Sequence, residues 1–347
     1  MCGSVSHLTA ADYMAEADAA HMTCEHCGES IHFGPAVAAL RDRDDVALRN
    51  DVVTSLAWYH TSTSADWPSP TFATQFAQEL SWIERDFGIS RQQFISHHTS
   101  KALHLGTYET AIENMLRRMD DQGDGGAQFY LYRVALRLDS RRINAGYRDE
   151  NHEIAADISE SDLDRDHLEA VRYLNVHEAM GVLSLAVRSD AIAAVQSTPI
   201  PFEGRSVAVD PGLFQAEIEA VSTTTRELAE AEAAATSVDP RERRMMQLGI
   251  RPDPTGMAQR IGDLQLRFYD SWHQLENKLG QHCLPSVSAV VRRDFNDAMA
   301  HRRIETPTTD VHAFVDRYRS MSVLLERPAE VIDVVTGQPW RVVRPGG

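Results

Sequence analysis

The chain has 347 residues, of which 43% are hydrophobic and 24% are charged, and this ordinary globular composition has the length of two or three domains. Its formal net charge of −17 argues against a protein wrapped in nucleic acid, because phosphate neutralisation requires clustered Lys and Arg. No apolar run reaches the roughly 18 residues that a membrane-spanning helix needs, so we expect no membrane partner.

The first fifty residues, 1–50, form an N-terminal segment that stands apart from the rest. Its opening, "MCGSVSHLTAADYMAEADAA", is acidic and lacks the basic and then apolar order of a signal peptide. We therefore expect a cytoplasmic protein. Four cysteines in a chain of this length do not form a disulfide framework.

A Cys-x-x-Cys pair in this segment predicts a metal site. Cys24 and Cys27 form "CEHCG", the usual shape of a zinc knuckle, because two thiolates at this spacing grip one tetrahedral ion. A structural zinc takes four ligands, and Cys2, His7 or His32 would complete the set. The alternative is a reduced pair of thiols on a loop, and a redox motif is disfavoured because no βαβ pattern surrounds the pair.

Residues 51 to 205 mix strand and helix patterns. An amphipathic helix is expected over Thr71 to Phe87, and a second helix follows Thr107, a favourable N-cap residue. Residues 139 to 167 are polar and acidic, and we interpret them as an excursion or a lid. Five apolar or alternating runs predict strands: "SLAWYH" (55–60), "KALHLGT" (101–107), "QFYLYRVALRL" (128–138), "AVRYLNV" (170–176) and "GVLSLAVR" (181–188).

From about residue 210 onward the pattern is helical. Apolar residues recur at spacings of three and four, which predicts amphipathic helices that pack on partner helices. The sequence therefore predicts an α+β fold, with a mixed β core over residues 51–205 and a helical domain over 206–347. The apolar faces are Phe214, Ile218, Val221 and Leu228; Ile261, Leu264, Phe268, Trp272, Leu275 and Leu279; Val287, Val290, Val291, Phe295 and Met299; and Phe314, Tyr318, Met321 and Leu325.

Short polar motifs accompany the predicted strands. "YHTS" (59–62) ends the first strand, "LHLGTYETA" (103–111) runs from the second strand into a helix, and Glu178 precedes the strand "VLSLAV". The P-loop, G-x-G-x-x-G, H-E-x-x-H and G-x-S-x-G motifs are absent from the sequence. In this order the motifs resemble the ADP-ribosyltransferase superfamily, particularly its bacterial-toxin, PARP-like and RES-like branches. Thr61 stands where the family has Gly, and "VLSLAV" offers only Ser184 where several members carry the catalytic Glu.

The resemblance implies an ADP-ribosyltransferase-like fold over residues 51–205 and NAD as a substrate. Family members cleave the nicotinamide N-glycosidic bond through an oxocarbenium-like state, which a nearby carboxylate stabilises. Glu178 and His60 would be the catalytic residues. His60 would bond the adenosine ribose, since a neutral imidazole can donate and accept at once. The NAD-binding residues would be His60, Thr61, Ser62, His104 and Tyr108.

Each of these residues also has a purely structural interpretation. His60 fits a turn cap after a buried strand, and His104 fits a half-buried core histidine. Tyr108 fits simple packing at the start of a helix, and Glu178 fits a solvated loop acid. These four structural interpretations stay open beside the catalytic ones.

Three further positions have open interpretations. Asn175 fits a residue that stitches its loop, and Arg133 is expected to meet either a phosphate or an internal acid. The adjacent pair His97 and His98 is disfavoured as a metal site, because neighbouring strand residues point to opposite faces.

Two functions of different classes follow. The first is an NAD-dependent ADP-ribosyltransferase or NAD-cleaving enzyme with a toxin or defence role, which acts on NAD and an acceptor such as a protein and carries zinc as an additional cofactor. The alternative is a non-catalytic interaction protein, with a decayed enzyme-like core and a helical module that binds a protein partner.

Overall fold

The computed structural model describes residues 21–24, 26–28, 30–32, 38–69, 100–150, 155–235, 239–301 and 310–344. The helix expected over residues 71–87 and the His97–His98 pair lie outside these ranges. The chain divides into two compact units. The first, which we call the sheet unit, comprises Met1–Met115, Gln128–Pro199 and Ile332–Gly347. The second, the helical unit, comprises Leu116–Ala127 and Ile200–Val331.

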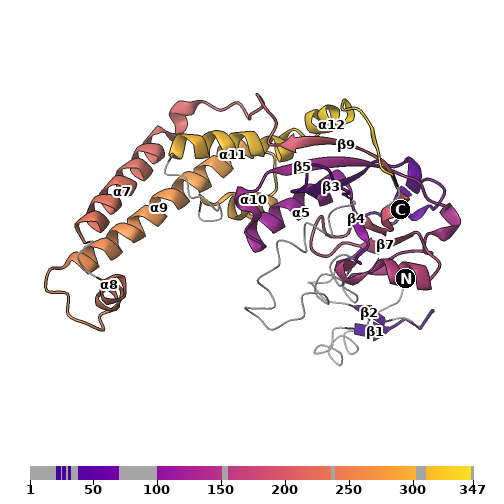
Figure 1. The fold of residues 1–347 in the computed structure, drawn as a ribbon, viewed down its shortest axis with the longest axis horizontal. Coiled ribbons are helices and arrows are strands. Elements are labelled where there is room, and N and C mark those ends of the chain that lie inside the picture. The colour runs from indigo at the N-terminus through magenta and orange to yellow at the C-terminus, as the bar shows by residue number, and fades with distance from the viewer. Residues whose placement is uncertain are drawn as a thin grey trace. The chain divides into compact units, whose positions relative to one another are not determined.

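The first sheet of the sheet unit has the strand order β10-β9-β5-β3 (Figure 1). β3 and β5 pair antiparallel, with His60 opposite Tyr132. Both strands bury most of their side chains, as their apolar patterns predict. The strand bounds are β3 (Trp58–Ser62), β5 (Phe129–Leu136), β9 (Ile192–Ile200) and β10 (Arg341–Val342).

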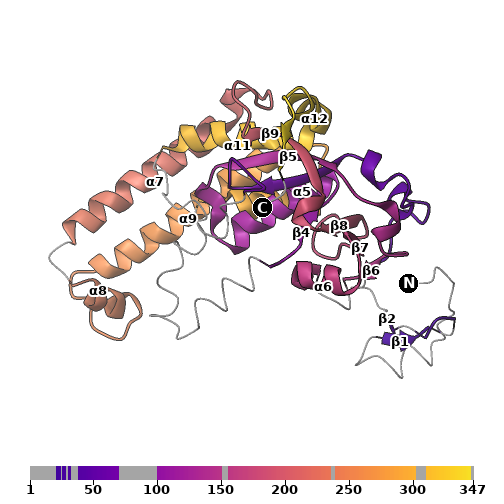
Figure 2. The same cartoon turned by 45° about the vertical axis from the view of Figure 1, so that its right-hand side comes forward.

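The second sheet of the unit has the strand order β4-β8-β7-β6. β7 and β8 are buried at every position, which explains why both read as continuous apolar runs. Helix α6 (Glu160–Arg165) accompanies this sheet in Figure 2, and its Leu163 packs with Val171 of β7 and Ala186 of β8. The strand bounds are β4 (Leu103–Leu105), β6 (Arg148–Asp149), β7 (Ala170–Leu174) and β8 (Leu183–Val187).

The two sheets are joined through β3 and the residue that follows β4. The N–H of Tyr59 donates to the carbonyl of Gly106 at 2.8 Å, and the N–H of Gly106 donates back to Tyr59 at 3.0 Å. Helix α5 (Tyr108–Asp121) begins directly after this contact. Thr107 caps the helix as expected, since its Oγ1 accepts the N–H of Thr110 at 3.3 Å.

Several sequence predictions need correction. β9 and β10 were not expected, because β9 mixes small and polar residues and the two residues of β10 form a strand only by pairing with β9. The polar segment 139–167 was expected to be an excursion or lid. Its described residues instead supply the edge strand β6, which pairs parallel with β7, and helix α6.

A short antiparallel pair precedes these sheets. β1 (His21–Thr23) and β2 (Ser30–His32) align His21 with His32, and Cys24 and Cys27 follow β1. The N–H of Gly28 closes the turn by donating to the Cys24 carbonyl at 2.9 Å.

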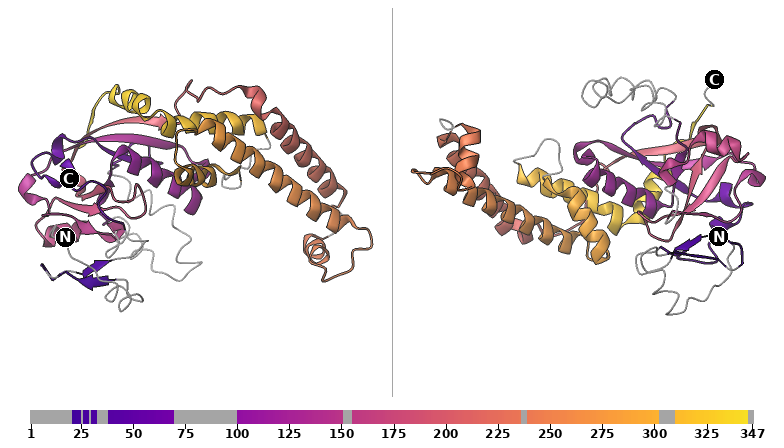
Figure 3. Two further views of the ribbon diagram at one scale, coloured as in Figure 1. Left: turned by 180° about the vertical axis from the view of Figure 1, so that it is seen from behind. Right: turned by 90° about the horizontal axis from the view of Figure 1, so that it is seen from below.

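The helical unit is organised around α9 (Met257–Cys283), which packs along α7 (Gln215–Ala234), as Figures 1 and 3 show. The predicted seam on α9 is confirmed, because five of its six residues are buried and Phe268 is half-buried. The helical unit also contains α8 (Pro240–Gln247), α10 (Ala289–Met299) and α11 (Val311–Glu326). Helix α12 (Pro328–Thr336) begins in this unit and ends in the sheet unit.

The fold class is therefore α+β, as the sequence predicts. Apart from β10, the strands of the described residues lie in the first 200 positions, and the long helices of the same ranges follow residue 210. Among the described helices, none has the length and apolar character to cross a membrane.

Candidate functional site

His60 lies in the middle of β3, and the expectation that it marks the end of the strand is wrong. The strand continues because the next two hydroxyls find partners. Thr61 is almost fully buried, and its Oγ1 donates to the carbonyl of Ala111 at 3.0 Å. Ser62 ends the strand, and its Oγ accepts the N–H of Ser64 at 3.1 Å.

The half-buried His60 side chain makes two well-defined contacts. Its Nδ1 lies 2.9 Å from the main-chain carbonyl oxygen of His104, and its ring stacks on Trp67 with centroids 4.1 Å apart. The contact with His104 joins a side chain of the first sheet to a strand of the second sheet. His60 is therefore held by packing and by a hydrogen bond to the second sheet.

His104 occupies the centre of β4, between Leu103 and Leu105. Its Nδ1 lies 3.1 Å from the hydroxyl of Tyr173. Burial lowers its pKa to about 4, the nearby Glu178 carboxylate opposes this shift, and Lys101 adds to it. At neutral pH the ring is uncharged. Within the described part of the chain, the buried Nε2 of His104 has no hydrogen-bond partner.

Tyr108 packs at the start of α5. Its ring meets Tyr59 edge-on, with centroids 5.7 Å apart, and burial raises its pKa above the usual value, with a further contribution from Tyr59. The hydroxyl therefore stays protonated at neutral pH. This contact agrees with the packing interpretation, and the role beside nicotinamide stays a prediction.

Glu178 is buried, and the interpretation of it as a solvated loop acid is wrong. Only 7% of the residue is exposed, and its Oε1 accepts a hydrogen bond from Nδ2 of Asn114 at 3.0 Å. Asn114 lies on α5, so the helix that follows β4 also positions the acid. Glutamates are seldom buried to this extent, and here the carboxylate is held by a neutral hydrogen-bond donor.

The loop between β7 and β8 presents Glu178 through an unusual backbone. Ala179 has a φ of 43°, a left-handed value that non-glycine residues rarely adopt, and its N–H donates to Glu113 on α5 at 2.5 Å. Gly181 has a φ of 85°, and a Cβ there would lie 2.4 Å from the carbonyl oxygen of Ala39. Backbone conformations of this kind concentrate at functional sites.

A second carboxylate lies near Glu178. Glu150 accepts the N–H of Val176 at 3.0 Å, and its pKa is raised by burial, with smaller opposing and reinforcing effects that include repulsion from Glu178. Sequence reasoning missed Glu150, Glu113 and Asn114. The last two stand together in "YETAIENML", but nothing in the sequence shows that this turn of the helix faces a loop 64 residues further on.

The structure therefore connects three of the predicted residues. His60 contacts the backbone of His104, and the imidazole of His104 is close enough to Glu178 for their charges to interact. Chemically, a buried carboxylate beside a neutral imidazole can stabilise a developing positive charge and can accept a proton. That these residues line one cleft stays a prediction.

Two other open positions now have structural partners. Asn175 bridges the two ends of its loop, because its Nδ2 donates to the Val182 carbonyl at 3.0 Å and to Ser184 Oγ at 2.7 Å. Arg133 has two neutral partners in the described chain, and its role toward a phosphate stays a prediction. Its guanidinium donates to Gln196 at 2.9 Å and lies 5.4 Å from the centre of the Trp340 ring.

The predicted zinc ligands are only partly described. Cys24 is buried and Cys27 is exposed, at the ends of the turn closed by Gly28. Across the described ranges there is no cluster of three or more His, Cys, Asp and Glu side chains suited to a metal ion. Cys2 and His7 lie outside those ranges, so zinc at this pair stays a prediction.

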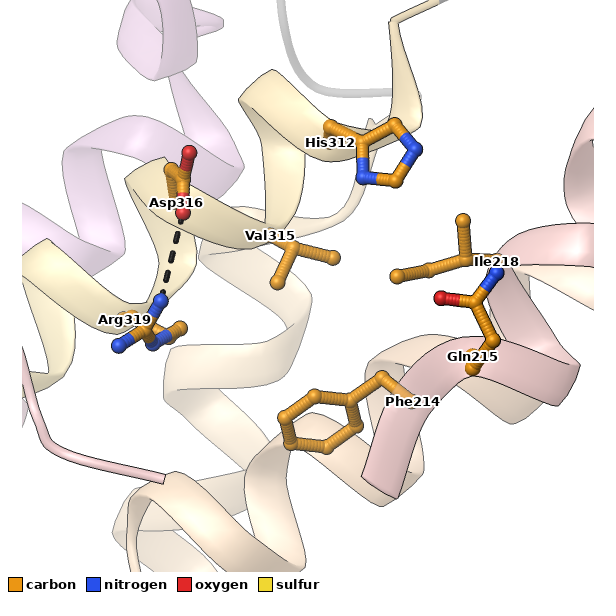
Figure 4. A pocket seen from close by; sticks show the side chains of 7 residues that line it. All are labelled: Phe214, Gln215, Ile218, His312, Val315, Asp316 and Arg319. Atoms are coloured by element: carbon orange, nitrogen blue, oxygen red, sulfur yellow. Dashed lines mark hydrogen bonds and ion pairs between the residues drawn. The ribbon is translucent and has the colours of Figure 1, made fainter. Parts of the chain in front are cut away.

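Two cavities lie away from these residues. One, of about 480 Å³, is in the sheet unit, and its polar groups bond one another, as when Asp139 N–H donates to Glu169 at 2.7 Å. The other, of about 150 Å³, is in the helical unit (Figure 4). There Arg319 is engaged by Asp316 at 3.4 Å and by the Val207 carbonyl at 3.2 Å. The residues that line this smaller cavity are Phe214, Gln215, Ile218, His312, Val315, Asp316 and Arg319.

In comparisons with protein-family models, with curated proteins and with solved structures, nothing matches this chain. The geometry of the sheet unit is therefore the basis for assigning a function.

Proposed function

We propose that the sheet unit is an NAD-dependent ADP-ribosyltransferase or NAD-cleaving domain. The observation that supports this proposal best is the buried Glu178 carboxylate, which Asn114 holds beside the neutral His104. His60, from the motif that resembles the family, bonds the backbone of the same His104. Three residues that are distant in sequence are thus linked, His60 to His104 by a hydrogen bond and Glu178 to His104 by electrostatic interaction.

In the proposed reaction, the bond between the nicotinamide nitrogen and ribose C1′ breaks, and nicotinamide leaves with the bonding electrons. Glu178 stabilises the positive charge that develops on the ribose. An oxygen nucleophile, from water or from an acceptor, then bonds C1′ and loses its proton to the Glu178 carboxylate. His60 and the main chain of Thr61 and Ser62 would hold the adenosine ribose, because the Thr61 hydroxyl already donates to Ala111.

Incubation of the full chain with NAD, followed by an assay for free nicotinamide, tests this proposal. We expect nicotinamide release, and we also expect NAD to raise the melting temperature. A ligand at 100 times its Kd stabilises the folded state by roughly 2.7 kcal/mol. If millimolar NAD produced no nicotinamide release and no thermal shift, the proposal would be contradicted.

A non-catalytic interaction protein is the second candidate. This candidate is favoured by the position of the acid. Several members of the family that the chain resembles carry the catalytic Glu within this strand, whereas Glu178 precedes β8 and the strand itself carries Ser184, which is bonded to Asn175. In that case the helical unit would be the binding module. NAD binding without nicotinamide release would support this candidate.

We also propose that Cys24 and Cys27 bind zinc. The Cys-x-x-Cys spacing supports this proposal, and so does Gly28, which has a φ of 76° and whose N–H donates to the Cys24 carbonyl. Metal analysis of purified protein is expected to find zinc that is lost in a Cys24→Ser variant. Protein without zinc would remove the idea.

A further inference from the structure

Helix α8 lies at the end of the hairpin formed by α7 and α9 (Figures 1 and 2). This helix and the residues after it form a small basic and apolar surface. We call residues 240–251, "PRERRMMQLGIR", the hairpin tip. It contains four arginines and one glutamate, a net charge of +3 in a chain whose net charge is −17. The tip is therefore opposite in charge to the chain as a whole.

The apolar side chains of the hairpin tip are exposed. Leu248 is 59% exposed and Ile250 is 60% exposed, and no residue of α8 is buried. Met245 and Met246 are half-buried beside them. Exposed aliphatic side chains are unfavourable in water. Together with neighbouring arginines they are stabilised at a surface that has an apolar layer beneath a negatively charged layer.

The conformation of the tip is well defined. Asp239 caps α8 by accepting the N–H groups of Arg241 and Glu242, and Gly249, with a φ of 70°, ends the helix. The N–H of Ile250 then donates to the Met245 carbonyl at 2.9 Å. The turn after Gly249 thus fixes Ile250 close to Leu248 on the outer surface.

The arginines of the tip are mostly not neutralised by neighbours. Arg251 pairs with Glu242 at 3.2 Å. Within the described residues Arg241, Arg243 and Arg244 have no ion pair. The carboxylates of Asp239 and Asp253 are occupied by helix N–H groups.

We propose that the hairpin tip binds the surface of an anionic lipid bilayer, with its arginines at the headgroups and Leu248 and Ile250 at the acyl boundary. This is peripheral binding and needs no spanning segment. Each arginine near such a surface strengthens binding by about fivefold at physiological salt. The negative charge elsewhere on the chain opposes binding weakly, because charges beyond a Debye length of about 8 Å are screened.

Other anionic partners fit the tip less well. The tip offers 12 residues, whereas a stable protein interface uses about 20–30 residues on each side. It has no aromatic residue for stacking on nucleic acid bases. Two tips of like charge would repel each other, so a symmetric contact between two copies is disfavoured.

Co-sedimentation of the full chain with vesicles tests this inference, which is independent of the proposed enzymatic function. At about 0.1 M salt, we expect binding to phosphatidylcholine vesicles that contain phosphatidylserine and no binding to pure phosphatidylcholine. The triple variant Arg241→Gln, Arg243→Gln, Arg244→Gln should bind about 100-fold more weakly. The double variant Leu248→Ser, Ile250→Ser should also lose binding with an unchanged melting temperature.

A matched triple variant serves as the control for net charge. Arg226→Gln, Arg267→Gln, Arg293→Gln removes three exposed arginines of the helical unit outside the tip, and it should bind like the unmodified chain. Equal losses in the two triple variants, or no binding to the anionic vesicles, would overturn the proposal. Two other results would also overturn the proposal. One is binding of single-stranded DNA that the Leu248→Ser, Ile250→Ser variant leaves unchanged, and the other is self-association that the tip variants abolish.

Discussion

The Nδ1 atom of His60 lies 2.9 Å from the main-chain carbonyl oxygen of His104, so the side chain of one strand bonds the backbone of a strand in the other sheet. Because a carbonyl oxygen only accepts, Nδ1 must carry the proton. In a neutral ring Nε2 is then the acceptor. His60 thus has a fixed tautomer and a fixed ring plane, which are the properties that a residue needs to orient a ribose hydroxyl.

Replacing His60 should separate its hydrogen bond from its packing. We expect His60→Ala to lower the free energy of unfolding by about 2 kcal/mol, because it removes both the bond to His104 and the stacking on Trp67. In His60→Asn the side-chain amide can replace the Nδ1 donor, so about half of this loss should be recovered. Urea denaturation measures both values, and equal losses in the two variants would contradict the proposed bond.

His104 should make stability depend on pH. Its folded-state pKa of about 4 lies below the unfolded value of about 6.5, so the unfolded chain binds the proton first as the pH falls. The free energy of unfolding should therefore decrease from about pH 6.5 downward, by about 3 kcal/mol once the pH is below about 4. His104 contributes no such loss above pH 7.

The variant His104→Asn isolates this contribution, because it keeps a polar atom near the Tyr173 hydroxyl and cannot titrate in this range. The difference between the two proteins in urea denaturation should grow steadily from pH 7 to pH 4.5. A difference that does not change with pH would show that His104 is not the group that titrates.

Local patterns predicted the elements of the fold better than their long-range connections. The seam on α9 and the cap at Thr107 are each encoded within a few neighbouring residues, so their sequence signals are sufficient. β10 is a strand only because it pairs with β9, which lies about 150 residues earlier, and no local signal describes that pairing.

The buried Arg172 shows a second limit of sequence reasoning. It lies within the apolar run of β7 and is fully buried, and its guanidinium donates to the carbonyl of Asn144 at 3.0 Å and to the side chain of Asn50. Local sequence cannot supply these partners, because they come from a loop and a turn that only the folded chain brings together. Glu178 is a similar case, since its burial depends on Asn114 from another element.

The loop that carries Glu178 should tolerate no side chain at Gly181. Alanine there must adopt a left-handed φ, and its Cβ would meet the Ala39 carbonyl oxygen at 2.4 Å. We expect Gly181→Ala to lower the free energy of unfolding by about 3 kcal/mol.

Gly204 provides the matched control for this loop. Its φ is 69°, but a Cβ there would have no atom within 4 Å, so Gly204→Ala should cost only about 1 kcal/mol. Similar losses in the two variants by thermal or urea denaturation would mean that the contact between Gly181 and Ala39 does not constrain the loop.

Glu178→Gln is the variant that separates chemistry from packing. The amide retains an oxygen that can accept the hydrogen bond from Asn114, so the shape of the site is preserved. It has no negative charge to stabilise an oxocarbenium-like state. Since removing one electrostatic stabiliser of a transition state typically costs about 100-fold to 1,000-fold in rate, nicotinamide release from NAD should fall by at least about 100-fold. Because Glu178 is buried, a loss of about 1 kcal/mol in the free energy of unfolding is also expected.

The control for this variant is Glu203→Gln, which removes the same charge from an exposed turn of the helical unit. It should release nicotinamide at the rate of the unmodified chain and melt at the same temperature. The decisive comparison is the nicotinamide release rate at saturating NAD, measured at a temperature where circular dichroism shows both variants to be folded. If Glu178→Gln retains full activity there, Glu178 is a structural acid held by α5, and the catalytic carboxylate must be sought elsewhere. Glu150 is then an alternative because it is close enough to interact with Glu178.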